Sequence, residues 1–317
     1  MHKISRNVSQ AFPPKPTFTE SSLSDLKGKV YIVTGASAGV GKELSGLLYS
    51  RNATVYLATR NANKTAAAND WIKQSHPTSS GALHFLKLDL NDLEGIKPAA
   101  EEFLSKEKRL DVLFNNAGVM VPPKGSVTKQ GYEQQLGTDC LAPFLFTKLL
   151  TPLLLQTAKS SPAGSVRVVW VSSSAAELIA PTGGVDMTNL NYANDKQDWH
   201  KYGVSKGGNV LHALEYQRRH QSQGITSVAL NPGNLKSDLQ RHVTWFQNFV
   251  IGFMLYPPVM GAYTQLFAGL APEVKNIEEG SWVIPWGRIG SVSKNYVGGS
   301  TAGEFWKWSE GEVARFV

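Results

Sequence analysis

The sequence predicts an α/β fold in which helices cover both faces of a doubly wound, parallel sheet of about seven strands. Apolar runs rich in β-branched residues alternate with helically periodic segments for most of the 317 residues. A glycine-rich turn joins the first such run to a helix, and small polar residues follow several later runs. A hydrophobic content of 42% supplies enough apolar surface for a sizeable core.

The predicted strands are the apolar runs, and a helix is expected after each of them. The runs are Lys29–Thr34, Thr54–Ala58, Leu83–Asp89, Leu110–Asn115, Val166–Val171 and Ile225–Leu230. The two longest helices are expected near Gln130–Gln156 and Tyr202–Gln221. No internal repeat or long polar linker divides the chain, so residues 27–317 are predicted to form one domain. The segment Leu235–Leu270 interrupts the alternation and is rich in Trp, Phe, Met and Leu, which predicts a helical lid over a ligand.

Residues 1–26 are predicted to form an N-terminal arm. Three prolines interrupt this segment and it has no apolar core, so it does not resemble a secretory signal. The most apolar window of the chain, Phe249–Tyr256, is too short to span a bilayer. The single cysteine, Cys140, excludes an internal disulfide and favours a reducing compartment, so we expect a cytoplasmic protein.

The charge pattern argues against two classes of partner. The formal net charge is +7, but no run of Lys or Arg exceeds two residues, so a nucleic-acid-binding face is not expected. The seven histidines show no HxxxH or HExxH pattern, so no metal site is expected.

The glycine-rich turn spans Thr34–Gly41, with the sequence TGASAGVG. It follows a strand and opens a helix, the context in which backbone N–H groups at a helix N-terminus bind a pyrophosphate. A structural strand–helix turn is the alternative. The residues predicted to contact a dinucleotide here are Gly35, Ser37, Ala38, Gly39, Val40 and Gly41.

The end of the second strand indicates which dinucleotide is bound. NAD-specific sheets of this kind usually carry an acidic residue there, which binds the ribose 2′-hydroxyl. This chain has none, and Arg60 is placed to bind a 2′-phosphate instead, so NADP is favoured. Arg60 as a solvated surface charge is the alternative. Asp89, with Leu90 beside it, is expected near the adenine, although a helix N-cap or turn residue is the alternative for Asp89.

Tyr202 and Lys206 are four residues apart, one turn apart on the same face of the predicted helix. A phenol with a pKa of about 10 is a poor acid or base at neutral pH. A nearby ammonium and an oxidised nicotinamide would lower that pKa. A catalytic role for this pair is supported by small polar residues that follow three other predicted strands. These residues lie at the sheet edge where open α/β folds bind ligands. These residues are Asn115–Gly118 (NNAG), Ser172–Ser174 and Asn231–Gly233.

These motifs occur in the order TGxxxGxG, NNAG, Ser, YxxxK and PG over residues 27–240, and there the sequence resembles the short-chain dehydrogenase/reductase family. The match is looser beyond. Within the family it looks most like the retinol-dehydrogenase-like branch, especially fungal members, on the stretches Ala58–Asn61, Lys201–Lys206 and Val283–Gly287. The resemblance implies a Rossmann-like fold and an NADP(H)-dependent oxidoreductase that interconverts a carbonyl and an alcohol.

The resemblance also implies roles for individual residues. Tyr202 would be the general acid/base, and Lys206 would lower its pKa and bind the cofactor ribose. Ser173, rather than its neighbours Ser172 and Ser174, would hydrogen-bond the substrate oxygen. Further cofactor contacts would come from Asn116, Ala117 and Gly118, and the nicotinamide would be bordered by Pro232, Gly233, Leu235 and Ser237, with Asn115 supporting the central strand.

Asp139 departs from the family pattern, which normally has asparagine at this place as part of a water-linked proton relay behind the lysine. Two readings remain open. The aspartate keeps the backbone kink and the water, and oxidoreduction is intact. Alternatively, the carboxylate pairs with Lys206, weakens its effect on Tyr202, and marks a slowed or repurposed site.

The substrate and the assembly are less determined. Trp245, Phe246, Phe249, Phe253, Met254 and Tyr256 form an aromatic-rich stretch in the predicted lid. Core packing, a pocket for a lipophilic carbonyl compound of secondary metabolism, and shallow peripheral contact with a membrane are its three readings. An isomerase, cyclase or lyase on the same cleft and a non-catalytic cofactor-binding protein are the alternative functions. Pairing through the two long helices, as a homodimer or homotetramer, is expected from the resemblance.

Overall fold

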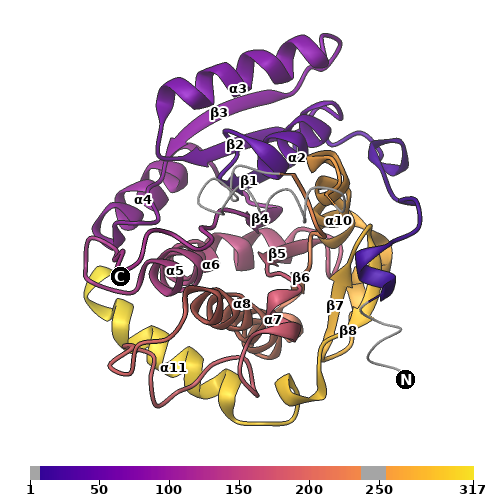
Figure 1. The fold of residues 1–317 in the computed structure, drawn as a ribbon. Helices are drawn as coiled ribbons and strands as arrows, with labels where there is room; N and C mark the ends of the chain where they lie inside the picture. The colour runs from indigo at the N-terminus through magenta and orange to yellow at the C-terminus, as the bar shows by residue number, and fades with distance from the viewer. Residues whose placement is uncertain (1–7, 237–254) are drawn as a thin grey trace.

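The computed structural model describes residues 8–236 and 255–317 (Figure 1). It confirms the α/β class with a Rossmann-like sheet, whose strand order is β3-β2-β1-β4-β5-β6-β7-β8. All neighbouring strands are parallel except β7 and β8. The strands are β1 (Val30–Thr34), β2 (Thr54–Thr59), β3 (Ala82–Lys87), β4 (Val112–Asn115), β5 (Val166–Val171), β6 (Ile225–Leu230), β7 (Ser281–Ile284) and β8 (Arg288–Ser291).

Helices cover both faces of the sheet, as the sequence predicts. On one face lie α2 (Gly39–Tyr49), α3 (Ala62–Ser75) and α10 (Pro258–Leu270), and on the other lie α4 (Ile96–Lys106), α6 (Ala142–Lys159) and α8 (Asp198–His220). In strands β1 to β7, residues that point to opposite faces enter one or the other of two apolar clusters, because side chains alternate along a strand. Further helices are α5 (Gln134–Leu136), α7 (Ala175–Leu178) and α11 (Thr301–Val313). Shorter helical turns are η1 (Glu20–Ser22), η2 (Leu93–Gly95), η3 (Gly137–Leu141), η4 (Gln221–Gln223), η6 (Pro272–Asn276), η7 (Lys294–Tyr296) and η8 (Ala314–Phe316).

The sheet has eight strands rather than about seven, because a short hairpin closes one edge. Strand β7 pairs with β6 through a single register, Leu230 with Val283, and β8 then returns antiparallel to β7. Each of these strands has only four residues, too few for an alternation to stand out in the sequence.

The predicted lid is too long at its C-terminal end. Residues 258–270 form α10, which packs against α2 and the sheet, with Ala262, Gln265 and Leu266 fully buried. An apolar helix that covers a sheet has the same composition as one that covers a ligand, so the sequence did not separate them. The aromatic stretch of the expected lid lies mostly in residues 237–254, outside the described residues.

The first long helix also differs from its prediction. It begins at Gln134 rather than Gln130, contains a π-helical turn at η3, and continues as α6 to Lys159. Residues Gln134–Lys159 are long and apolar enough to cross a membrane by length and composition, and 72% of their most apolar window is buried inside the fold. Such burial is typical of a core helix.

The N-terminal arm packs onto the body of the protein. Residues 8–11 are helical, and the buried Gln10 accepts a hydrogen bond of 2.9 Å from Nδ2 of Asn231. Arg288 of β8 donates to the Oγ and the carbonyl oxygen of Ser9, at 2.8 and 2.7 Å. The arm thus reaches the loop that follows β6.

Candidate active site

The predicted site residues gather at the carboxyl edge of the sheet, where β1, β4, β5 and β6 end. From β1 the strand order runs outward through β2 to β3, and the chain then crosses back to place β4 on the other side of β1. The order of the strands therefore reverses between β1 and β4. Open α/β sheets bind ligands at this switch point, beyond the carboxyl ends of the strands. The turns after β1, β4 and β5 carry the TGxxxGxG, NNAG and serine motifs, and the structure therefore brings these three motifs to one edge.

The glycine-rich turn fits an anionic group. Gly35 and Gly39 have φ values of +68° and +53°, which side chains larger than glycine rarely adopt. A Cβ on Gly39 would meet no atom within 4 Å, so the space above the turn is open. Ala38, the N-cap of α2, has no side-chain hydrogen bond to offer, whereas Asn61 caps α3 through the amide of Lys64. The first N–H groups of α2 therefore lack a side-chain cap and point to a pyrophosphate as their partner.

The glycine-rich turn and the NNAG turn form one hydrogen-bonded unit. The Oγ1 of Thr34 accepts from the backbone amides of Asn116 and Ala117, both at 2.9 Å. Nδ2 of Asn116 donates to the carbonyl of Thr34 at 2.7 Å, and its Oδ1 accepts from Nε2 of Gln265 at 2.6 Å. A Cβ on Gly41 would lie 2.6 Å from that Nδ2. The sequence did not single out Thr34 or Gln265, because Gln265 joins the site from 149 residues away.

The residues predicted around the adenosine end lie beyond β2 and β3. Arg60 directly follows β2 and is exposed, and it has no ion pair with the described residues. Strand β3 ends at Lys87, so Asp89 lies in the next turn rather than at the strand end. There its Oδ1 accepts from the amide of Asn91 at 3.0 Å, which is the turn role that the sequence left open. Leu90 is buried beside it.

Tyr202 and Lys206 both lie on α8, with the Lys206 Nζ 5.6 Å from the centroid of the phenol ring. Ser173, the second residue after β5, is half-buried and forms a side-chain hydrogen bond with Tyr202. Ser172 instead turns inward and donates to the carbonyl oxygen of Lys206 at 2.7 Å. The structure thus brings together the serine, tyrosine and lysine that the sequence predicts, and it separates Ser173 from its neighbour.

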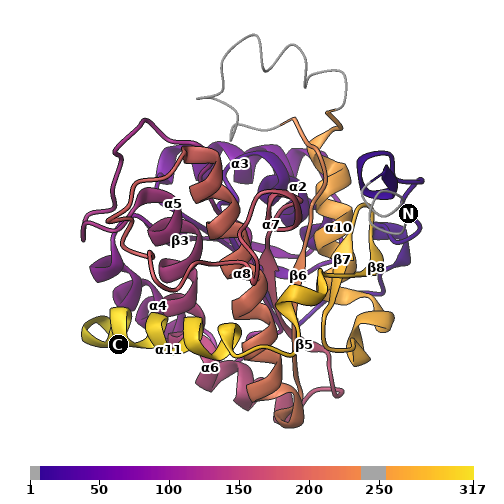
Figure 2. The same cartoon turned by 60° about the horizontal axis from the view of Figure 1, so that its bottom comes forward.

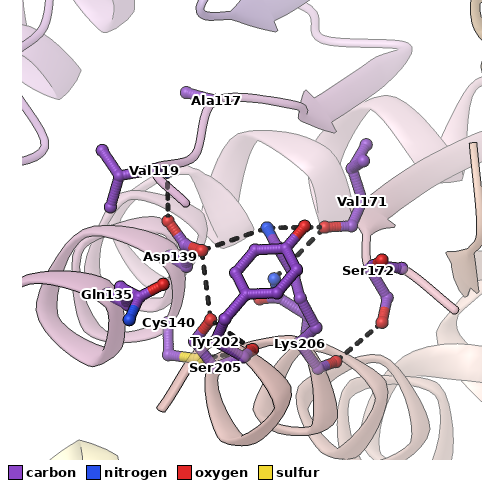
Figure 3. A network of polar contacts seen from close by, with 12 residues as sticks. Ala117, Val119, Gln135, Asp139, Cys140, Val171, Ser172, Tyr202, Ser205 and Lys206 are labelled. Carbon is purple, nitrogen blue, oxygen red and sulfur yellow. Dashed lines mark hydrogen bonds and ion pairs between the residues drawn. The ribbon is translucent and has the colours of Figure 1, made fainter. Parts of the chain in front are cut away.

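Asp139 lies on the π-helical turn behind this group (Figure 3). Its Oδ2 is 3.1 Å from the Nζ of Lys206 and accepts from the Oγ of Ser205 at 3.1 Å. Its Oδ1 accepts from the backbone amide of Val119 at 2.7 Å. The Nζ of Lys206 also lies 3.5 Å from the carbonyl oxygen of Val171. Ser205 and Val119 are contacts that the sequence did not reveal.

The charges in this group are coupled. Burial raises the pKa of Tyr202, Lys206 lowers it, Asp139 raises it, and the hydrogen bond with Ser173 lowers it, so that the phenol pKa lies above its ordinary value. Burial opposes the Lys206 ammonium, but Asp139 and Tyr202 more than offset this and raise the lysine pKa. Lys206 thus lowers the phenol pKa as expected, but burial raises that pKa by more, so the net shift is upward.

The loop after β6 forms the remaining wall. Gly233 has a φ of +92°, and a Cβ there would lie 2.5 Å from the Trp286 ring. Leu235 is buried and pairs with Tyr256, whose ring packs edge-on against Trp286 with centroids 5.0 Å apart. Pro232 is half-buried at the start of this loop. Ser237 lies outside the described residues.

A metal has no evident place in the part of the chain that the structure describes. Within residues 8–236 and 255–317, no group of three or more His, Cys, Asp or Glu side chains is placed to hold a metal ion. Cys140 is buried, and its thiol donates to the carbonyl oxygen of Ser205 at 2.9 Å.

Comparison with known proteins agrees with the fold and the motifs. Residues 29–247 match the short chain dehydrogenase family. A short-chain dehydrogenase/reductase of Phomopsis amygdali is 51% identical over 97% of this chain and 96% of its own length. The short-chain dehydrogenase/reductase pkfC of Emericella nidulans is 48% identical over 95% and 98%. The crystal structure of an uncharacterised protein from Mycobacterium paratuberculosis has a TM-score of 0.70 at 27% identity, covering 94% of this chain and 97% of that one. The chain therefore belongs to the short-chain dehydrogenase/reductase family, whose members are NAD(P)(H)-dependent oxidoreductases acting on small molecules.

Proposed function

We propose that this protein is an NADP(H)-dependent oxidoreductase that interconverts a carbonyl and an alcohol on a lipophilic small molecule, with Tyr202 as the general acid/base. The observation that carries the proposal is the placement of Ser173, Tyr202 and Lys206 at the same sheet edge as the glycine-rich turn. A cofactor-binding protein without catalysis would need the turn but not this group.

In the direction of reduction, Ser173 and Tyr202 hydrogen-bond the substrate carbonyl oxygen. Tyr202 then gives its phenolic proton to that oxygen as negative charge develops on it, and such general acid help contributes roughly 10²–10⁴-fold. A bound nicotinamide would supply the hydride. Lys206 stabilises the phenolate that remains, because its ammonium lies close to the ring.

Support for NADP comes from the end of β2. The strand ends in Thr59 without a carboxylate, and the exposed Arg60 has no ion pair among residues 8–236 and 255–317 that would occupy it. A guanidinium can bind a 2′-phosphate through two parallel hydrogen bonds. The pool of this cofactor is generally kept reduced in cells, so we propose reduction as the direction of the reaction.

Support for a lipophilic substrate comes from aromatic residues around the site. Trp199 is 37% exposed and stands edge-on to Tyr202, with ring centroids 6.0 Å apart. Tyr256 and Trp286 line the loop after β6. We therefore propose that the substrate is a bulky carbonyl compound of secondary metabolism, of the retinoid-, polyketide- or terpenoid-like type. On the motif stretches Ala58–Asn61, Lys201–Lys206 and Val283–Gly287, we also propose that the chain belongs to the retinol-dehydrogenase-like branch.

Further proposals concern the molecule as a whole. We propose that residues 27–317 act as one catalytic domain and that residues 1–26 are its arm. Pairing of two copies through α6 and α8 would require a free face, but α11 already contacts α8 there. We therefore propose that any homodimer or homotetramer uses another surface. A cytoplasmic location, with peripheral membrane contact through the aromatic-rich stretch from Trp245 to Tyr256, also stays a prediction.

The test is a Tyr202→Phe variant beside the wild type. We expect the variant to bind NADPH normally in a fluorescence titration and to oxidise it at least 10²-fold more slowly, because only the proton donor is lost. Oxidation would be followed at 340 nm against a panel of lipophilic ketones, aldehydes and quinones. Equal affinity of the wild type for NADH would contradict the role of Arg60.

The contrary result favours a second function. Tight NADPH binding without Tyr202-dependent consumption would favour isomerase, cyclase or lyase chemistry on the same cleft. The observation behind that candidate is the Asp139–Lys206 ion pair, which gives the lysine a second charged partner besides the Tyr202 phenol. NADPH oxidation that Tyr202→Phe leaves unchanged would contradict the role of Tyr202 as the general acid/base.

A further inference from the structure

The Asp139–Lys206 ion pair is buried on all sides. The side chains of Asp139 and Lys206 are 0% and 6% exposed, and their charged atoms are 3.1 Å apart. A single unpaired charge would be costly in such surroundings, so each side chain stabilises the charged form of the other. The π-helical turn Gly137–Leu141 carries the carboxylate to this position, and turns of this type in helices occur frequently at functional sites.

The hydrogen-bond donors around Asp139 show what the carboxylate adds. The amide of Val119 donates to Oδ1, whereas the hydroxyl of Ser205 and the ammonium of Lys206 converge on Oδ2. An asparagine amide could still accept from Val119, and its NH₂ could donate to Ser205, because the serine hydroxyl has another acceptor in the carbonyl of Tyr202 at 2.9 Å. The NH₂ could not accept from Lys206. An amide would therefore satisfy every contact except the one to the lysine.

The ion pair changes what Tyr202 experiences. Lys206 favours the phenolate, but the negative charge of Asp139 beside it opposes that effect at the same ring. We propose that Asp139 is a positioning residue for the reaction: it holds the Lys206 ammonium in a buried ion pair and biases Tyr202 toward the protonated, proton-donating form. The inference rests on the proposed function, since it assigns the site a preference for reduction.

Other charged groups near the pair do not replace this effect. Glu133 on the preceding turn is within electrostatic reach of Asp139, but its carboxylate accepts from the amides of Gln135 and Leu136. Burial raises the pKa of the Cys140 thiol well above its ordinary value, so it is uncharged at neutral pH. Among the titratable groups of the described residues, Asp139 and Lys206 are thus the two whose charges act on Tyr202.

The test is the variant Asp139→Asn, with Glu133→Gln as a matched control that removes a neighbouring carboxylate without a contact to Lys206. In Asp139→Asn the Nζ of Lys206 keeps the carbonyl oxygen of Val171 and the Tyr202 ring as neighbours, so we expect it to stay protonated. With the ammonium in place, removing the negative charge should lower the pKa of Tyr202. For reduction, which needs the protonated phenol, the basic limb of the kcat/KM–pH profile should move to lower pH by about one unit. For oxidation, which needs the phenolate, the acidic limb should move the same way. Glu133→Gln should leave both limbs in place.

A second measurement keeps the inference separate from the proposed function. The ultraviolet difference between each protein and its Tyr202→Phe counterpart reports phenolate formation at this one tyrosine, without substrate. In the Asp139→Asn background that signal should appear at lower pH than in the wild type. An unchanged titration in a folded Asp139→Asn protein would overturn the inference. A shifted titration in a protein that reduces no carbonyl would support it and count against the proposed function alone.

Discussion

At the scale of single residues, two adjacent serines have different surroundings. Ser172 is 2% exposed and donates to the carbonyl oxygen of Lys206, so it joins the end of β5 to α8. Ser173 is half-buried, accepts from the amide of Ala175 at 3.2 Å, and contacts Tyr202. The first serine therefore supports the position of the lysine, and the second faces the reacting group.

This difference predicts opposite outcomes for two alanine variants. Ser173→Ala should lower kcat/KM by about 10²-fold, as expected for loss of one hydrogen bond to a developing oxyanion, with little change in stability. Ser172→Ala should cost about 1 kcal/mol of unfolding free energy, the net value of one buried hydrogen bond, with a smaller loss of activity. Urea unfolding and steady-state kinetics on both variants check this. A larger kinetic loss for Ser172→Ala would reverse the assignment.

At the scale of elements, the glycine-rich turn and the NNAG turn hold each other. The contact is tightest at Gly41, where a Cβ would lie 2.8 Å from the carbonyl oxygen of Gly35 as well as 2.6 Å from Asn116. A Cβ on Gly35 would likewise lie 3.0 Å from Ala117. These glycines serve close packing between two turns, in addition to the approach of a ligand.

Gly41→Ala should therefore weaken cofactor binding and the fold together. The added methyl group must displace backbone or the Asn116 amide, and overpacking of this kind costs about 1–3 kcal/mol. Gly95→Ala is the matched control, because Gly95 has a φ of −76° and a Cβ there would meet no atom within 4 Å. Thermal unfolding and NADPH titration would be compared between the two. Equal effects of both changes would contradict the packing argument.

The elements themselves were predictable where the sequence pattern is local. Strands β5 and β6 begin and end where the sequence predicts, because each is a run rich in β-branched and apolar residues between polar turns. The π-helical turn was expected only as the backbone kink at Asp139 that the family resemblance implies, and its contacts with Val119 and Ser205 join distant parts of the chain that no local pattern relates. The candidate site was predictable as a set of residues, but the partner of Asp139 was left open between a water relay and Lys206.

At the scale of the whole molecule, α11 closes one side of the protein. Trp306 stands edge-on to Phe144 of α6, with centroids 4.7 Å apart, and the Arg219 guanidinium lies 4.7 Å above the Trp306 ring. Lys148 of α6 and Glu310 form an ion pair of 3.0 Å. Figure 1 shows α11 below α8, and in Figure 2, with the bottom of the molecule turned forward, α11 crosses in front of α6. The chain's own C-terminal helix thus covers the part of α6 and α8 around Phe144, Lys148 and Arg219.

We expect the protein to show no dimer that uses this face. Size-exclusion chromatography with light scattering would give the mass, and Lys148→Glu would test the face itself. That change breaks the ion pair with Glu310 and should loosen α11 rather than dissociate an oligomer. A dimer in the wild type that Lys148→Glu converts to a monomer would contradict this expectation.

Contacts between distant parts of the chain set the limit of prediction at this scale. Gln10 and Asn231 are 221 residues apart, and no local pattern relates them. The arm was therefore predicted only as a terminal segment, and the β7–β8 hairpin that Arg288 joins to Ser9 was missed with it.

The pairing of Leu235 with Tyr256 has a consequence for how the protein can change over evolution. The two ends of the intervening segment are joined by backbone bonds, from the amide of Lys236 to the carbonyl of Tyr256 and from the amide of Tyr256 to the carbonyl of Asn234, both at 2.9 Å. Bonds of this kind do not depend on which side chains lie between them. The segment can accordingly be exchanged as a cassette, so relatives that share the sheet and the site can diverge in substrate while their folding core stays the same.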